Sequence, residues 1–283
     1  MTNEEILSRL HELELLLVDE VVRICKRHGI PYFLAAGSML GALRHEGFIP
    51  WDDDVDIGML REDYERFLEV CEREIDGERF YLQTEEKEKY YPFGFAKLRL
   101  KGTNVAETFG VGAKGKENGA GVYVDIFPFD AVPDDEKKRR RLYRKYWFYR
   151  NLLFVKCGFG KASQKKRGLR LVGAFLSRFF SVGFLKKRKR VLITGLRGEK
   201  TEFVVNADGG YGLEKETIRR CWVENTAEFR FEGRLLCGVS DAEAYLSYLY
   251  GDFRKLPPES ERNHHGRLSV DFGPYGPSAE KCE

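Results

Sequence analysis

The stretch that decides the fold runs from residue 34 to residue 60 and reads LAAGSMLGALRHEGFIPWDDDVDIGML. An apolar run leads into a small-residue turn, Gly37-Ser38, and sixteen residues later come Asp54 and Asp56, with one apolar residue between them. A turn that opens a helix, followed by paired carboxylates, is what is needed to hold a nucleotide phosphate against a divalent metal ion. The pattern therefore favours a metal-dependent transferase that acts on a nucleotide-activated substrate.

The two aspartates are candidate metal ligands. Residues 54–59 are predicted to form a strand, in which alternate side chains share one face, so Asp54 and Asp56 are expected side by side with Cα atoms roughly 6–7 Å apart. Two carboxylates at that distance repel each other unless a cation lies between them. Mg²⁺ prefers hard oxygen ligands of this kind, so Mg²⁺ or Mn²⁺ is the expected cofactor.

The turn and the helix after it supply candidate phosphate ligands. Gly37 has no Cβ, so its backbone can approach a phosphate closely, and Ser38 can donate its hydroxyl. The amides that open the predicted helix over residues 38–44 attract an anion. Arg44 and His45 close that helix, where they either contact the diphosphate or cap the helix C-terminus.

Outward from this stretch, helix and strand patterns alternate, which predicts an α+β fold. Capping signals at Thr2 and Glu5 begin a long helix that ends at Gly29, and Glu232-Gly233 divides an alternating run into a hairpin. Helices are expected at 2–28, 38–44, 62–75 and 241–251, and strands at 32–36, at 54–59, in several pieces over 79–127 and in the hairpin 228–239.

Three further sites carry polar residues of interest. Asp125 interrupts the apolar run VYVDIF, where a charge is costly unless it is paired or bound to metal. Lys97 lies between apolar residues of a predicted strand and either reaches a phosphate or faces outward. His264 and His265 lie in a polar stretch and are either exposed or part of the site.

Basic residues are concentrated in one part of the chain, residues 137–190, here called the basic block. It contains 20 Lys or Arg and no Asp or Glu, so the remainder carries 28 basic and 45 acidic residues. The block indicates helices interrupted at Gly158 and Gly160. Three interpretations stay open: a helical surface whose charged ends reach water, a surface for anionic membrane, and, least favoured, a nucleic-acid surface.

No signal peptide is expected, because the N-terminus, TNEEILSRLHELE, has no basic segment followed by an apolar stretch, and no transmembrane helix is expected, because there is no run of 18 uncharged apolar residues. The six cysteines form no CxxC pair, which favours reduced thiols over a zinc or redox motif. We therefore expect a cytoplasmic protein, with peripheral contact at the inner face of the membrane as one option.

The sequence resembles the LicD family, which is akin to fukutin and the fukutin-related protein within the nucleotidyltransferase-fold superfamily. The stretches that carry the resemblance occur in family order from about residue 10 to residue 265. They are AAGSMLGALRHEGFIPWDDDVDIGM with REDYERFL after it, FAKLRLKGT at 95–103, VYVDIFPFD at 122–130 and YLYGDFRKLPPESERNHH at 248–265. The basic block matches only as a helical insert.

This resemblance implies a nucleotidyltransferase-like mixed sheet flanked by helices, with residues 1–132 as the catalytic core, 133–198 as a basic helical insert and 199–283 as an α+β part that completes the site. It implies that Asp125 is a third carboxylate beside Asp54 and Asp56, and that the three are catalytic and bind metal. The residues implied at the nucleotide and its phosphates are Gly37, Ser38, Arg44, His45, Lys97, His264 and His265.

The activity implied by the resemblance is transfer of a phospho-alcohol, of the phosphocholine type, from a CDP-linked donor to a sugar hydroxyl of a cell-surface glycan or its lipid-linked precursor. Asp125 or a nearby histidine would take the hydroxyl proton. Two alternatives stay open: a nucleotidyltransferase that moves NMP from an NTP to a small molecule or sugar hydroxyl, and a non-catalytic, membrane-associated scaffold. Nucleic acid is not an expected partner.

Overall fold

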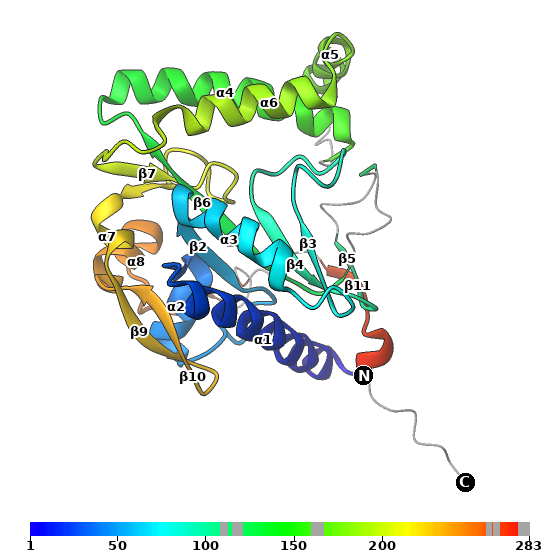
Figure 1. The fold of residues 1–283 in the computed structure, drawn as a ribbon, viewed down its shortest axis with the longest axis vertical. Helices are drawn as coiled ribbons and strands as arrows, with labels where there is room; N and C mark the ends of the chain where they lie inside the picture. The colour runs from blue at the N-terminus through cyan, green and yellow to red at the C-terminus, as the bar shows by residue number, and fades with distance from the viewer. Residues whose placement is uncertain (108–112, 115–120, 160–166, 259–261, 263–266, 277–283) are drawn as a thin grey trace.

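The computed structural model describes residues 1–107, 113–114, 121–159, 167–258, 262 and 267–276. In this part of the chain, nine strands form one mixed sheet with helices packed against it, which confirms the predicted α+β class (Figure 1). The strands of this sheet are β1 (Phe33–Leu34), β2 (Asp56–Leu60), β3 (Phe80–Gln83), β4 (Ala96–Leu100), β6 (Tyr123–Val132), β7 (Phe203–Val205), β8 (Thr217–Arg219), β9 (Thr226–Phe231) and β10 (Arg234–Val239). A separate two-stranded sheet pairs β5 (Asn104–Glu107) with β11 (Arg267–Asp271).

Helices lie on the sheet and form a layer at one end of it (Figure 1). Those beside the sheet are α1 (Asn3–His28), α2 (Ala36–His45), α3 (Arg61–Glu74), α7 (Arg220–Glu224) and α8 (Ala242–Tyr250). The end layer consists of α4 (Glu136–Cys157), α5 (Arg167–Ser177) and α6 (Val182–Ile193). Two short 3₁₀ turns, η4 (Thr194–Leu196) and η6 (Gly273–Tyr275), complete the described elements.

The sheet joins strands from both ends of the chain. Its order is β3-β4-β6-β2-β1-β10-β9, and β7 and β8 extend it from the far end of β6. β2 runs parallel to β6 and β1 runs parallel to β10, whereas the other pairs are antiparallel. Because β1 pairs with β10, the N-terminal strand is completed by a strand from the last third of the chain.

Local sequence signals explain several element boundaries. The Glu5 amide donates a hydrogen bond to the Thr2 hydroxyl at 3.2 Å, and the Thr2 amide donates one to the Glu5 carboxylate at 2.7 Å. These two bonds confirm the predicted capping box of α1. The predicted hairpin is also confirmed, with left-handed backbone at Glu232 and Gly233 between β9 and β10. Asp241 caps α8 through the Ala244 amide, as predicted.

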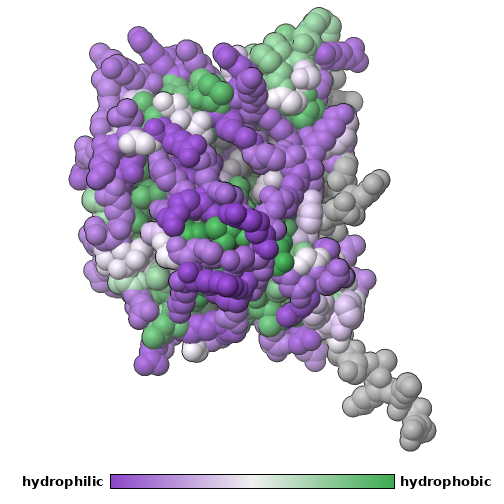
Figure 2. Space-filling view, viewed as in Figure 1, coloured by the Kyte–Doolittle hydropathy of each residue, from purple (hydrophilic) through white to green (hydrophobic). Residues whose placement is uncertain are grey.

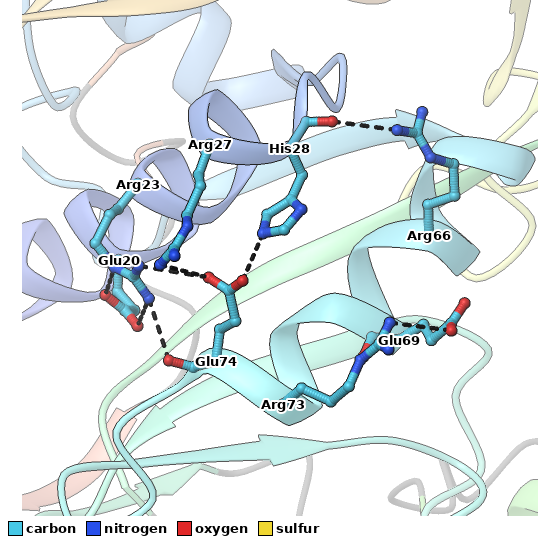
Figure 3. A network of polar contacts seen from close by, with 8 residues as sticks. All are labelled: Glu20, Arg23, Arg27, His28, Arg66, Glu69, Arg73 and Glu74. Atoms are coloured by element: carbon cyan, nitrogen blue, oxygen red, sulfur yellow. Dashed lines mark hydrogen bonds and ion pairs between the residues drawn. The ribbon is translucent and has the colours of Figure 1, made fainter.

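Ion pairs join α1 to α3 on the surface (Figure 3). Glu74, at the end of α3, lies 2.6 Å from His28 Nε2 and 3.4 Å from Arg27 Nη1, both on α1. The hydrogen bond from His28, helped by the arginines of α1, lowers the pKa of Glu74 below its usual value. The Arg66 guanidinium on α3 donates to the His28 carbonyl at 3.2 Å, so the two helices are linked at the C-terminus of α1.

Several basic residues of the end layer are internal. Lys189 of α6 is 1% exposed and its Nζ lies 2.8 Å from Asp208, while Arg150 of α4 lies 2.9 Å from the same carboxylate. Lys186 donates to the carbonyl of Glu85 at 2.7 Å. Part of the basic block is therefore buried, and its lysines and arginines join the end layer to the core. The sequence pattern did not predict this role.

We expect Asp208→Asn to lower the free energy of unfolding at pH 7 by about 3 kcal/mol, because it leaves Lys189 and Arg150 without their buried counter-charge. Burial raises the pKa of Asp208, but Lys189, Arg150 and the Gly94 amide lower it to about 2. A lowered pKa contributes stability above about pH 4 that is lost as the pH falls toward 2, so the difference should shrink over that range. Urea unfolding followed by circular dichroism measures this.

The exposed pair of Glu69 and Arg73, 3.0 Å apart, provides the control for this prediction (Figure 3). Glu69→Gln is expected to change the free energy of unfolding by less than about 0.5 kcal/mol, because a surface ion pair contributes little. Equal effects of the two substitutions would contradict the assignment of Asp208 to a stabilising buried cluster.

Candidate active site

A cavity of about 600 Å³ opens beside the N-terminus of α2 and the first residues of β2 and β6. Its lining includes Gly37, Arg44, Asp54, Asp56 and Asp125. Residues that the sequence analysis singled out from three separate parts of the chain therefore meet at one cavity.

Strand register places two carboxylates and a lysine in one row. Asp56 of β2 is paired with Asp125 of β6, and Asp125 is paired with Lys97 of β4. Neighbouring strands lie about 4.8 Å apart, so paired side chains are adjacent on one face. Lys97 is buried, and its Nζ lies 2.6 Å from Asp125 Oδ1 and 3.4 Å from the centroid of the Tyr123 ring. The outward-facing option for Lys97 is therefore wrong, and Lys97 offsets the charge of Asp125.

Asp54 lies in the cavity but not on the strand, which differs from the prediction. β2 begins at Asp56, and hydrogen bonds set this start: the Asp56 amide donates to Ser38 Oγ at 2.8 Å, and the Asp125 amide donates to the Val55 carbonyl at 3.0 Å. Asp54 thus belongs to the preceding loop. Ser38, expected at a phosphate, here joins α2 to the start of β2.

The N-terminus of α2 faces the cavity at Gly37. Ala35, the residue before the helix, provides no side-chain cap. The Ala36 amide donates to the Tyr245 hydroxyl at 3.0 Å. A Cβ on Gly37 would lie 3.0 Å from Asp52 Oδ2, so glycine allows this close approach. The positive end of a helix dipole attracts anionic groups, and the Asp52 carboxylate already lies near it.

Arg44 and His45 contact each other at the end of α2. Arg44 Nε donates to His45 Nε2 at 2.9 Å, and Arg44 Nη1 donates to the Phe253 carbonyl at 2.9 Å. Burial, together with the Arg44 charge, lowers the pKa of His45, so the imidazole is a neutral acceptor at pH 7. Arg44 lines the cavity, whereas the contact shown for His45 is to Arg44. His264 and His265 lie outside the described residues.

The carboxylates fit a hard divalent cation in their chemistry. Asp54, Asp56 and Asp125 line one cavity and offer the oxygen donors that Mg²⁺ or Mn²⁺ prefers. Across the described ranges, no three His, Cys, Asp or Glu side chains converge closely enough to form a metal centre. The metal and its three ligands therefore stay a prediction.

Glu216 is a cavity residue that the sequence analysis missed. It is 7% exposed, lines the same cavity, and its Oε1 accepts the Tyr211 amide at 3.0 Å. A Cβ on Gly209 would fall 2.3 Å from the Glu216 carboxyl carbon, so the glycine makes room for it. Burial raises the pKa of Glu216 to about 7, against the smaller opposing effects of the Tyr211 amide and Lys215. Such a carboxyl suits acid–base chemistry near neutral pH.

A mixed sheet that presents carboxylates beside the N-terminus of a helix is the arrangement of a nucleotidyltransferase-type domain. The sequence profile described as "LicD/FKTN/FKRP, nucleotidyltransferase domain" matches residues 29–157. The chain is 30% identical to the lipopolysaccharide cholinephosphotransferase LicD of Haemophilus influenzae over 259 residues, which cover 88% of this chain and 91% of that protein. It belongs to the LicD family, and it is accordingly a phosphotransferase.

A shorter similarity links the chain to animal relatives. A stretch of 43 residues is 51% identical to the ribitol 5-phosphate transferase FKRP of Homo sapiens, which is 15% of this chain and 9% of that protein. The same length and identity relate the chain to the ribitol 5-phosphate transferase FKRP of Mus musculus.

Glu216→Gln tests the raised pKa. A folded pKa above the unfolded one gives stability that is present below about pH 4.5 and lost as the pH rises through 7. Glutamine keeps the shape and the acceptor for Tyr211. We expect the free energy of unfolding of Glu216→Gln, relative to that of the wild type, to rise by about 2–3 kcal/mol between pH 4.5 and pH 8. Urea unfolding at each pH measures this difference. Exposed Glu214 supplies the control, Glu214→Gln, for which the difference should stay constant. A constant difference for Glu216→Gln would contradict the assignment.

Proposed function

We propose that this protein transfers a phospho-alcohol of the phosphocholine type from a CDP-linked donor to a sugar hydroxyl of a cell-surface glycan or its lipid-linked precursor. The observation that carries the proposal is the adjacent pairing of Asp56 with Asp125 at the cavity beside Gly37. It occurs in a chain that is 30% identical to a lipopolysaccharide cholinephosphotransferase over 88% of its length.

The donor would lie with its diphosphate between the helix and the carboxylates. Gly37 and the first amides of α2 receive phosphate oxygens, and Arg44 adds a positive charge from the same cavity wall. Asp54, Asp56 and Asp125 would hold Mg²⁺ or Mn²⁺. That ion, when bound, neutralises the diphosphate and stabilises the leaving group.

Transfer requires one bond to form and one to break. The acceptor hydroxyl oxygen attacks the distal phosphorus, the bond from that phosphorus to the bridging oxygen breaks, and CMP leaves. We assign the hydroxyl proton to the Glu216 carboxylate. Asp125 is less suited, because Lys97 already lies 2.6 Å from it, whereas the pKa of Glu216 near 7 lets this group accept a proton at neutral pH.

A nucleotidyltransferase reaction would use the same carboxylates and the same helix N-terminus. The acceptor would then attack the α-phosphorus of an NTP, and pyrophosphate would leave. The third alternative, a membrane-associated scaffold without catalysis, disagrees with the membership of the LicD family, whose members are phosphotransferases. The relationship to a cholinephosphotransferase favours the first reaction.

A lipid-linked acceptor would be met at a membrane surface, and the end layer supports such a location. Phe175, in the last turn of α5, and Phe179, two residues beyond its end, are 57% and 70% exposed, and Arg178 between them is also exposed. Figure 2 shows apolar residues gathered at the upper right, where α5 lies in Figure 1. Exposed apolar side chains beside exposed basic ones are typical of a surface that binds anionic lipid. No described helix is long and apolar enough to cross a membrane, so the proposed contact is peripheral.

Product analysis tests the reaction. With Mg²⁺, a panel of CDP-alcohols and NTPs and a glycan acceptor, mass spectrometry is expected to find CMP and a glycan that carries the phospho-alcohol. Release of pyrophosphate would establish the nucleotidyltransferase instead. Asp56→Asn and Asp125→Asn are each expected to lower kcat by about 100-fold or more, because each removes a carboxylate proposed to hold the metal ion that neutralises the diphosphate.

Asp135→Asn is the matched control for these variants. Asp135 caps α4, away from the cavity lining, and asparagine caps a helix equally well, so kcat should stay within about twofold. Unchanged activity and unchanged metal binding in an Asp54→Asn, Asp56→Asn double variant would rule out the catalytic and metal-binding roles proposed for these two aspartates.

Flotation with liposomes tests the membrane contact. The wild type is expected to float with vesicles that contain phosphatidylglycerol and to remain behind with purely zwitterionic ones. The double variant Phe175→Ser, Phe179→Ser should lose most of this binding, because it removes the exposed apolar side chains. Leu235→Ser, at an equally exposed position on β10, should bind like the wild type. Equal flotation of both variants would contradict the proposed membrane contact at Phe175 and Phe179.

A further inference from the structure

A second cavity, here called the α4 groove, adjoins the candidate active site. It has a volume of about 1200 Å³ and lies between α4 and residues 207–215. Gly209, Gly210 and Tyr211 line both the α4 groove and the cavity that holds the carboxylates. The two spaces therefore share a wall.

The α4 groove exposes flat aromatic surfaces. Trp147, Phe148 and Tyr211 line it and are 55%, 44% and 47% exposed. The Tyr211 ring is held in place, because its hydroxyl is 3.0 Å from that of Tyr250 and the two rings contact edge to face. Exposed aromatic groups gathered in one concave surface indicate a binding site, and flat rings suit the apolar faces of sugar rings.

The same groove carries an excess of positive charge. Arg140, Arg144 and Lys215 line it and are exposed, and Glu214 is the acidic residue of its lining. Arg140 also pairs with Glu136 at 2.7 Å. A fourth cation of the lining, Arg150, is already engaged by buried Asp208 and takes little part. Guanidinium groups bind phosphate and carboxylate through paired hydrogen bonds, so the lining suits an anion.

We propose that the α4 groove binds the acceptor, and that this acceptor is an anionic saccharide, with phosphate or carboxylate groups on the sugars next to the reacting one. This inference rests on the proposed function. Tyr211 connects the two spaces: its ring lines the groove, and its amide holds the Glu216 carboxylate at 3.0 Å. A saccharide that lies along the groove can thus present its terminal hydroxyl to Glu216. The donor's diphosphate has separate partners at Gly37 and the aspartates.

Isothermal titration calorimetry on the full chain tests this with two probes. CDP-choline with Mg²⁺ reports on the active-site cavity. The phosphorylated core oligosaccharide released from lipopolysaccharide, before and after enzymatic dephosphorylation, reports on the groove. The wild type is expected to bind the phosphorylated form about tenfold more tightly. Arg144→Ala with Trp147→Ala should weaken that binding about tenfold or more, with the affinity for CDP-choline within about twofold of the wild type.

Phe184→Ala with Lys187→Ala is the matched control, since it removes an exposed aromatic and an exposed cation from α6 outside the groove lining. It should bind both probes like the wild type. Equal effects of the two double variants, equal affinity for the two saccharide forms, or no saccharide binding by the wild type would each overturn the assignment. Failure of the wild type to bind CDP-choline would count against the proposed function, while the saccharide titrations still decide what the groove binds.

Discussion

The parallel pairing of β2 with β6 forces two carboxylates, Asp56 and Asp125, next to each other at the edge of a cavity. Like charges at that distance are unfavourable unless positive groups surround them. The fold supplies these groups from different elements: Lys97 on β4 contacts Asp125 directly, and the N-terminus of α2 opens on the same cavity. The position of β4 beside β6 and the position of α2 at the cavity thus both place positive charge near the two adjacent carboxylates.

The end layer has the opposite charge problem. A segment with many cations and no acidic residue packs against the core only where carboxylates and carbonyl groups receive the cations that become buried. Asp208 receives Lys189 and Arg150 in this way. The same short segment continues to Tyr211 and Glu216 in the cavity wall. The helices thus hold one wall of the candidate active site, although they contribute none of its carboxylates.

Capping and turn chemistry are local, which is why α1, the β9–β10 hairpin and α8 were predictable from the sequence. The meeting of Gly37, Asp56 and Asp125 at one cavity followed from the resemblance to the LicD family. The exact start of β2 was not, because it depends on a hydrogen bond from the Asp56 amide to Ser38. Glu216 carries no motif, since its burial and its raised pKa arise from packing against distant segments. Lys189 was missed because inward and outward lysines look alike in a run of basic residues.

β1 is only two residues long, and its parallel partner β10 lies in the last third of the chain. The Ala36 amide, at the start of α2, bonds to a tyrosine hydroxyl 209 residues further on. Contacts of such separation form late, because the intervening loop must first be closed. A ribosome therefore synthesises most of this protein before the N-terminus of α2 can be fixed in place. A chain that ends before β10 and α8 lacks both contacts, so the N-terminal part of the cavity depends on segments that are synthesised about 200 residues later.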